Sequence, residues 1–311
     1  MTIHPQRPAP AVLFVDDEER ILRTLQVLFR PHCRVLTTTD AREALQLLQA
    51  EDIAVLVSDQ RMPVMSGSEL LARARELAPD TVRILLTGYA DVDSAIHALN
   101  DGEIHRYLTK PWTVEGIVRT VRDALAVAEA VRAPVIPDLQ EPLRPALAGI
   151  LVIDDDPATL AAIRSMAAPG QPVMHATGLT RAVETLGSCP IGVIVTDIVV
   201  GGDDMTHLLR TLKQQYPEVL SIVVTGTRDT PRLIRLINQA QVFRYFPKPL
   251  RSGIVARGLA SAMTRYNEAR RLPLPASARV EDATTEVERT LSRRIGEYLA
   301  RLRSRNAATT G

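Results

Sequence analysis

Asp59 stands at the carboxyl end of a short apolar, β-branched run, and a turn-rich loop follows it in the sequence VLVSDQRMPVMSG. Two further acids, Asp16 and Asp17, end another apolar run, and Lys110 ends a third. Because open α/β sheets bind ligands at the carboxyl ends of their strands, we expect these side chains to meet at one edge. Three carboxylates at one site repel one another unless a cation joins them. Mg²⁺ prefers oxygen ligands, so the sequence predicts a magnesium site.

The same residues predict covalent phosphate chemistry at Asp59. A carboxylate at a strand tip can attack phosphorus and become an aspartyl phosphate. Mg²⁺ would bridge the phosphoryl oxygens and Lys110 would add positive charge, since phosphoryl transfer depends on positioning and charge neutralisation. Thr87 ends a further apolar run, and its hydroxyl can donate to a phosphoryl oxygen. We therefore expect Asp59 to accept phosphate and Thr87 to move inward as a switch.

These side chains need a sheet to bring them together, and the hydrophobic pattern predicts one. Apolar runs alternate with stretches of helical spacing, and Asp40 is the expected N-cap of the second helix. Such alternation indicates a parallel sheet with helices on both faces, and five βα units fit the flavodoxin-like doubly wound fold. The predicted strands are 11–15, 34–38, 53–58, 82–87 and 104–109, and the predicted helices are 21–29, 41–49, 68–77, 91–100 and 114–131.

The whole pattern occurs twice, at a constant offset of 138 positions. Asp59 recurs as Asp197, and no insertion is needed between the matching landmarks. A fixed period of this kind indicates a tandem duplication of one α/β domain. The other matching residues are Asp16 with Asp154, Asp17 with Asp155, Thr87 with Thr225, Tyr107 with Tyr245, and Lys110 with Lys248.

Proline density and hydrophobic spacing divide the chain. We expect a disordered lead-in at 1–10, a first domain at 11–131, a Pro-rich linker at 132–148, a second domain at 149–268, a loose linker at 269–285 and a helix at 286–305. That last helix carries an apolar stripe with arginines beside it. Three roles stay open for it: a dimer contact, an appendage docked on a domain, or a DNA contact.

The amino-acid composition indicates which cellular compartment and which classes of partner suit the protein. The chain has 311 residues, 46% of them apolar and 23% charged, with a net charge of +1, so no global field favours nucleic acid or a membrane surface. Its two cysteines, Cys33 and Cys189, form no disulfide framework and suit a reducing compartment. The first ten residues have no apolar signal core. We expect a soluble cytoplasmic protein.

The segments SDQRMPVMSG, LLTGYAD and RYLTKPW together resemble the receiver domain of bacterial two-component response regulators. They look like the receiver subclass found in hydrogenase-type transcription regulators and in cyclic-di-GMP phosphodiesterases, although neither output domain is visible here. The resemblance covers about 11–130 and 149–268. It implies two tandem receiver domains, Mg²⁺ as cofactor, a histidine kinase as partner, a homodimer, and a phosphotransfer or effector protein downstream.

The resemblance also gives each matching position a role. In the first copy, the acidic metal pair is Asp16 and Asp17, the acceptor is Asp59, the metal-binding backbone carbonyl is that of Arg61, the switch residues are Thr87 and Tyr107, and the lysine before a cis proline is Lys110. In the second copy the same roles fall on Asp154, Asp155, Asp197, Val199 (carbonyl), Thr225, Tyr245 and Lys248.

Some of these residues could instead have ordinary structural roles. Asp16 and Asp154 could cap the first helix of each domain, and the two tyrosines could be ordinary packing residues. The second copy also has Val200-Gly201-Gly202-Asp203-Asp204 where the first has Met62-Pro63 and, further on, Gly67. We expect a more flexible loop there and a second site that is tuned differently from the first.

The prediction for function is a response regulator with two phosphoacceptor domains that signals through protein contacts, dimerisation or phosphorelay. We expect no enzymatic turnover beyond phosphoryl acceptance and slow self-dephosphorylation. One alternative is a DNA-binding transcriptional regulator that uses the basic helix at 286–305, although no helix-turn-helix pattern is visible. Another is a phosphatase, but Arg61 stands where a general acid two residues after Asp59 would be needed.

Overall fold

The structure, a computed structural model, describes residues 11–88, 96, 99–132, 148–226 and 230–269. The chain separates into two compact units that divide between Ala133 and Pro134, and each is described by itself. The segments predicted at 1–10 and 286–305, and nearly all of the linkers predicted at 132–148 and 269–285, lie outside the described residues. No helix in the described part is both long and apolar enough to cross a membrane.

The first unit is a five-stranded, fully parallel sheet in the order β2-β1-β3-β4-β5. This is the flavodoxin-like order, and the predicted doubly wound fold is confirmed. The strands are β1 (Ala11–Val15), β2 (Arg34–Thr38), β3 (Ile53–Asp59), β4 (Val82–Gly88) and β5 (Arg106–Lys110). The helices are α1 (Glu19–Phe29), α2 (Ala41–Ala50), α3 (Gly67–Leu77) and α5 (Val114–Arg132).

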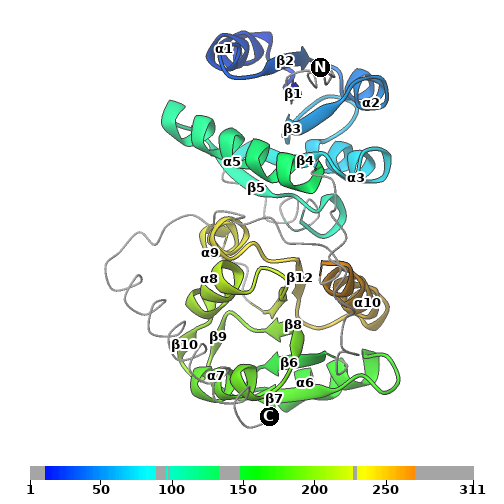
Figure 1. The fold of residues 1–311 in the computed structure, drawn as a ribbon, viewed down its shortest axis with the longest axis vertical. Coiled ribbons are helices and arrows are strands. Elements are labelled where there is room, and N and C mark those ends of the chain that lie inside the picture. Colours follow the sequence, from blue (N-terminus) through cyan, green and yellow to red (C-terminus); the bar gives the residue numbers. More distant parts are fainter. Residues whose placement is uncertain (1–10, 89–95, 97–98, 133–147, 227–229, 270–311) are drawn as a thin grey trace, which may run out of the picture. The chain divides into compact units, whose positions relative to one another are not determined.

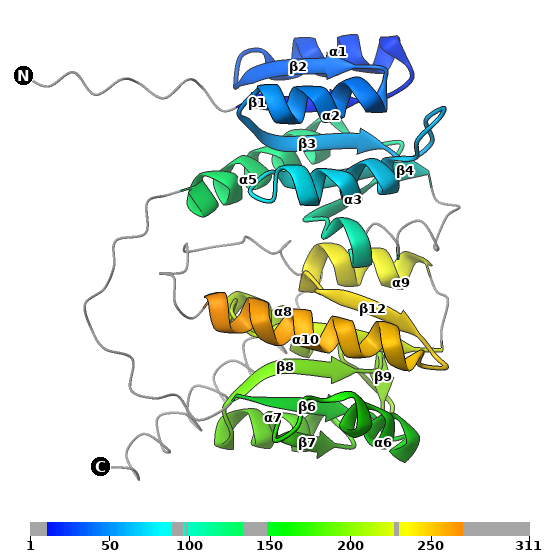
Figure 2. The same cartoon turned by 90° about the vertical axis from the view of Figure 1, so that its right-hand side faces the viewer.

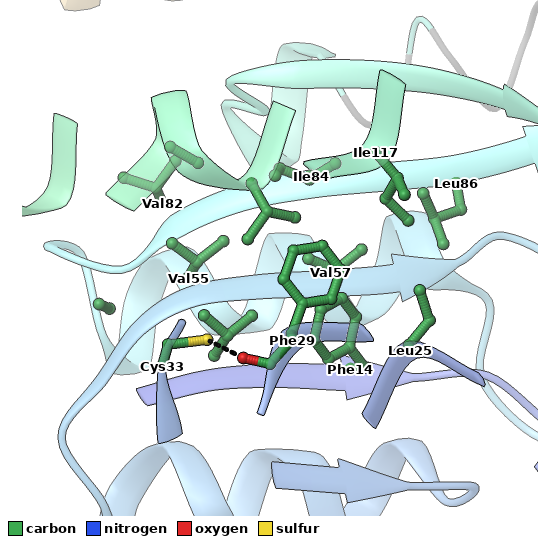
Figure 3. Close-up of a cluster of buried hydrophobic side chains, with 14 of the residues drawn as sticks. Phe14, Leu25, Phe29, Cys33, Val55, Val57, Val82, Ile84, Leu86 and Ile117 are labelled. Atoms are coloured by element: carbon green, nitrogen blue, oxygen red, sulfur yellow. Dashed lines mark hydrogen bonds between the residues drawn. The ribbon is translucent and has the colours of Figure 1, made fainter. Parts of the chain in front are cut away.

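Helices cover both faces of this sheet (Figure 1). α1 and α5 pack on one face, where Phe14, Phe29, Val57, Ile84 and Ile117 belong to one buried cluster (Figure 3). α2 and α3 cover the other face. β1 and β3 are buried along their whole length, because both of their faces lie under helices. The strand tips that carry Asp16 and Asp59 are thereby fixed by the core.

Local signals set the element ends. The Asp40 side chain accepts the N–H of Arg42 at 2.7 Å, which confirms it as the N-cap of α2. β5 begins at Arg106, two residues later than predicted, because Glu103 adopts a left-handed φ of 47° and the chain is still turning there. Most of the helix predicted at 91–100 lies outside the described residues.

The second unit repeats the architecture, with a parallel sheet in the order β12-β11-β8-β6-β7. Figure 2 shows β6, β8 and β12 running in one direction. α6 and α10 pack on one face of the sheet, and α7, α8 and α9 cover the other (Figure 1). The strands are β6 (Gly149–Ile153), β7 (Val173–Ala176), β8 (Ile191–Thr196), β11 (Leu220–Thr225) and β12 (Arg244–Pro247). The helices are α6 (Pro157–Met166), α7 (Leu179–Ser188), α8 (Thr206–Gln215), α9 (Thr230–Arg235) and α10 (Ser252–Ala269), with a π-helical turn, η1 (Leu236–Ala240), directly after α9.

The two units differ most in the loop after the third strand. In the second unit this loop is a short antiparallel hairpin of β9 (Val199–Val200) and β10 (Asp203–Asp204). The sequence predicts a more flexible loop here; the structure places a regular hairpin at this position, and the flexibility stays a prediction. Gly201 and Gly202 have φ values of 60° and 88°, which is the two-residue turn with two positive φ angles that suits a tight hairpin. The Val200 side chain is fully buried and anchors the hairpin to the domain.

Candidate functional site

The first site forms where three strands end. Asp59 is the last residue of β3, Lys110 is the last residue of β5, and Asp16 directly follows β1. Lys110 Nζ lies 2.9 Å from Asp16 Oδ2 and also pairs with Asp59 Oδ1. The carboxylates are buried, with side chains exposed by only 1% for Asp16 and 7% for Asp59. The structure therefore brings together three of the residues that the sequence predicts, as one lysine-bridged acid pair.

Backbone N–H groups hold both acids in place. Asp59 Oδ2 accepts the N–H of Arg61 at 2.6 Å, and Asp16 Oδ1 accepts the N–H of Glu18 at 3.0 Å. Glu18, rather than Asp16, occupies the N-cap position of α1. Asp16 is thus fixed toward Lys110 inside the site, and the helix-cap role is not the one it has in this structure.

Burial and pairing pull the pKa values of this site in opposite directions. Burial raises the pKa of the Asp16 carboxyl above its usual value, although hydrogen bonds from Lys110 and from the N–H of Glu18 lower it. Burial alone would lower the pKa of Lys110, but hydrogen bonds with Asp59 and Asp16 outweigh it, so the pKa of Lys110 is raised. Lys110 therefore stays charged at neutral pH and is the counter-ion of the site.

Asp16→Asn is expected to stabilise the first domain by about 1 kcal/mol at neutral pH. The pKa of Asp16 in the folded state lies above its ordinary value of 3.8, so stability falls as pH rises from that value through the folded pKa and the loss persists above it. Asparagine removes the buried charge and keeps an acceptor for Lys110. Thermal unfolding without Mg²⁺, read by the fluorescence of Trp112, the chain's one tryptophan, checks this.

The matched control is Asp17→Asn, because the Asp17 side chain is exposed and its replacement should change stability by less than about 0.5 kcal/mol. The gain of the Asp16 variant should shrink as the pH approaches 3.8. A loss of stability at pH 7, or a gain equal to that of the control, would show that burial of this charge carries no cost.

The other predicted metal ligands of the first site follow Asp16 and Asp59 closely in the chain, but their side chains are not gathered into the buried acid pair. Asp17 follows Asp16 on the loop after β1 and is exposed to solvent, as is the side chain of Arg61. Within the described residues, no three His, Cys, Asp or Glu side chains are grouped so that they could hold a metal ion as they stand. The donor chemistry still fits Mg²⁺, since the loop presents carboxylate and carbonyl oxygens beside Asp59.

The predicted switch residues lie inside the domain. Thr87 is buried on β4, and its Oγ1 donates to the carbonyl of Gly88 at 3.2 Å. Tyr107 on β5 is also buried, with 1% of its surface exposed. In the second domain Thr225 and Tyr245 are buried in the same way. These four residues are therefore positioned beneath the site, and their switching role stays a prediction.

The loop after Asp59 depends on two special backbone positions. Val64 has a φ of 71°, and the N–H of Met65 donates to the carbonyl of Pro63 at 2.8 Å, which makes a tight γ-turn. Gly67 lies against the backbone of Asp59, where a Cβ atom would be 2.1 Å from the Asp59 carbonyl oxygen. Only glycine allows this close approach. Gly67 belongs to the motif after Asp59, but the sequence motif alone does not reveal this packing role.

The second site has the same arrangement with a more open acceptor. Lys248 Nζ lies 2.8 Å from Asp154 Oδ2 and 2.8 Å from Asp197 Oδ2. The Asp197 side chain is 19% exposed, against 7% for Asp59, and its Oδ1 accepts the N–H of Ile198 at 2.6 Å. The Lys110–Pro111 and Lys248–Pro249 peptide bonds are both cis. The acid pair and its lysine are thus intact in both copies.

Two contacts of the second site lie outside the sequence prediction. His175 Nε2 pairs with the carbonyl oxygen of Asp154 at 2.9 Å, so this histidine supports the acid loop. The N–H of Gly201, at the tip of the β9–β10 hairpin, donates to Asp155 Oδ2 at 3.3 Å. The Gly-Gly pair between two valines and two aspartates is a hairpin signal that was available in the sequence. The role of His175 had no comparable signal.

Comparisons with known proteins agree with this geometry. The family pattern of the response regulator receiver domain matches residues 12–122 and 150–256, well over half of the chain. The hydrogenase transcriptional regulatory protein HoxA of Bradyrhizobium diazoefficiens is 40% identical over 114 residues, which is 37% of this chain and 24% of that regulator. This chain therefore spans about a quarter of the length of that relative.

A second relative covers both domains. A response regulator receiver protein of Anaeromyxobacter sp. is 27% identical over 220 residues, 70% of this chain and 84% of that protein. Among solved structures, the signal receiver domain of an HD domain-containing protein from Pseudomonas fluorescens Pf-5 is 38% identical with a TM-score of 0.40, and the match covers 42% of this chain and 98% of that one. From the two family matches, each on one doubly wound domain, the chain belongs to the response regulator receiver family and carries two receiver domains in tandem.

Proposed function

We propose that the protein is a response regulator in which Asp59 and Asp197 each accept a phosphoryl group from a partner histidine kinase. One observation carries this proposal: a lysine bridges two acids at the same strand ends in both domains, and of these acids Asp16, Asp59 and Asp154 are buried. An ion pair with a purely structural role would not require the strand-end threonine and the adjacent exposed acid to recur with it in the second domain. The proposed domain limits are 11–131 and 149–268.

In the first domain the proposed chemistry is a direct transfer. An oxygen of the Asp59 carboxylate attacks the phosphorus, the P–N bond of a phosphohistidine breaks, and an acyl phosphate forms on Asp59 as the imidazole leaves. The N–H of Arg61 orients the carboxylate through Oδ2. Lys110 turns from the free carboxylate to the phosphoryl oxygens and keeps the site near neutral. Asp197 and Lys248 do the same in the second domain.

A divalent cation fits this proposal. Asp16, Asp17 and Asp59 with the carbonyl of Arg61 would hold Mg²⁺ in the first domain, and the second set is Asp154, Asp155, Asp197 and the carbonyl of Val199. When bound, Mg²⁺ supplies charge neutralisation at the phosphoryl oxygens. Asp16 and Asp154 already give one oxygen to the lysine, so we propose outer-shell roles for them and direct ligation by Asp17 and Asp155.

The output is proposed to run through protein contacts. Several relatives are named as transcriptional regulators, but the match covers only 24% and 25% of two of them. We propose signalling by dimerisation, partner binding or onward phosphotransfer in the cytoplasm. The DNA-binding alternative rests on residues 286–305, which lie outside the described part of the chain, and no described contact favours it.

Incubation with acetyl phosphate tests the proposal directly. We expect Mg²⁺-dependent labelling of the wild-type chain, partial labelling of the Asp59→Ala and Asp197→Ala variants, and none of the double variant. Chelation of the metal with EDTA serves as the control. Labelling of the double variant at the wild-type level, or an unlabelled wild type, would sink the proposal.

A further inference from the structure

The β9–β10 hairpin of the second domain touches two places that matter for its site. Figure 2 shows β9 beside the carboxyl ends of the strands, where the acids lie. At its tip, Gly201 donates its N–H to Asp155 Oδ2 at 3.3 Å. At its base, Asp204 pairs with Arg232 of α9 at 3.8 Å. The hairpin thus contacts the acid loop after β6 at one end and helix α9 at the other.

The Gly201 contact is specific to the second domain. Its counterpart in the first domain is Pro63, which has no N–H to donate to Asp17. Asp17 is exposed, so its two oxygens are accessible to a cation from solvent. Asp155 Oδ2 accepts the N–H of Gly201, so a cation that binds through this oxygen shares it with that N–H or displaces the hydrogen bond. Since a hydrogen bond to a charged acceptor is stronger than a neutral one, this competition weakens cation binding.

The β9–β10 hairpin is held in place by contacts with the rest of the second domain. Val200 is fully buried, the N–H of Met205 donates to the carbonyl of Ile198 at 2.8 Å, and Asp204 Oδ1 accepts the N–H of Thr206 at 2.9 Å. The other oxygen of Asp204 faces Arg232. Asp204 therefore has a backbone donor for one oxygen and a cationic neighbour for the other.

We propose that the β9–β10 hairpin is a brake on the second site: it engages Asp155 through Gly201, weakens divalent cation binding there, and is held in place by Arg232 of α9. Arg232 is a positioning residue in this account, because it acts on the site only through the hairpin. The inference rests on the proposed metal role of Asp155. It makes the position of α9 a determinant of when the second domain can be phosphorylated.

Calorimetric titration of the full chain with Mg²⁺ tests the brake without any activity readout. Asp155→Asn with Asp197→Asn leaves only the first site, and Asp17→Asn with Asp59→Asn leaves only the second. We expect about fivefold weaker Mg²⁺ binding at the second site. Replacing 199–205 by the first-domain loop RMPVMSG should bring the two affinities within about twofold of each other.

Arg232→Gln provides a test that leaves the loop sequence intact. In the background with only the second site, this change should tighten Mg²⁺ binding about twofold, because an exposed ion pair contributes modestly. The matched control is Arg235→Gln, an exposed arginine on the same helix, which should leave the affinity unchanged. Equal affinities at the two sites, or the same affinity in the Arg232 and Arg235 variants, would overturn the brake. Failure of the proposed function is distinguishable, since then the first site would bind no Mg²⁺ either.

Discussion

Lys110→Ala is expected to slow Mg²⁺-dependent labelling of Asp59 by acetyl phosphate about 100-fold. Lys110 Nζ contacts both buried carboxylates of the first site, so it is the side chain best placed to take over phosphoryl oxygens when Asp59 is modified. A preformed positive charge in a buried site stabilises developing negative charge far more than it would in water. The rate is measured with Asp197→Asn present, so that all label comes from the first domain.

The same substitution is expected to destabilise the first domain by about 3 kcal/mol in the absence of Mg²⁺. It leaves Asp16 and Asp59, which are 1% and 7% exposed, without their counter-ion. Mg²⁺ should then raise the unfolding temperature of the variant more than that of the wild type, because the ion replaces the missing charge.

Two further variants separate charge from shape. Lys110→Arg keeps the charge and should recover most of the stability but little of the labelling rate, since the guanidinium has a different geometry. Lys248→Ala, measured with Asp59→Asn, should repeat both effects in the second domain. Labelling of Lys110→Ala at the wild-type rate would contradict the assigned role.

Gly67→Ala is expected to destabilise the first domain by about 3 kcal/mol and to disturb the acceptor loop. An added Cβ would lie 2.1 Å from the carbonyl oxygen of Asp59 and 2.9 Å from a methyl carbon of Leu85. The oxygen belongs to the backbone and cannot swing aside as a side chain would. Either α3 or the end of β3 must shift, and Asp59 moves with it. Unfolding followed by Trp112 fluorescence measures the loss.

Gly88→Ala is the control, because a Cβ there meets nothing within 4 Å. Its effect should stay within about 0.5 kcal/mol. The second domain already contains the comparison: Met205 stands at the position of Gly67, and the loop before it is a hairpin instead of a γ-turn. If Gly67→Ala were as stable as Gly88→Ala, the close contact with Asp59 would not constrain the loop.

The fold was predictable because each strand carries its own signal. The runs ending at Val15, Asp59 and Thr87 are apolar and β-branched, and burial under helices on both faces requires that composition. The constant offset then located the three site acids of the second domain, Asp154, Asp155 and Asp197. The β9–β10 hairpin was missed because its strands are two residues long, which is too short for alternation to be visible.

The candidate site was predictable in its residues but not in its contacts. The predicted strand ends indicated which side chains lie at the same edge of the sheet. The contacts of Lys110 with Asp16 and Asp59 agree with that prediction. The support of Asp154 by His175 and the capture of Asp155 by Gly201 depend on packing between distant segments. No local pattern in the chain encodes them.

The most direct measurement is the identity of the modified residues after treatment with acetyl phosphate and Mg²⁺. Borohydride reduces an acyl phosphate to the alcohol, so peptide mass spectrometry then reports each aspartyl phosphate as homoserine at its own position. We predict conversion at Asp59 and at Asp197 and at no other acid, with Asp16, Asp17, Asp154 and Asp155 unchanged. Conversion at neither acceptor, or at the acid pairs in their place, would contradict the account.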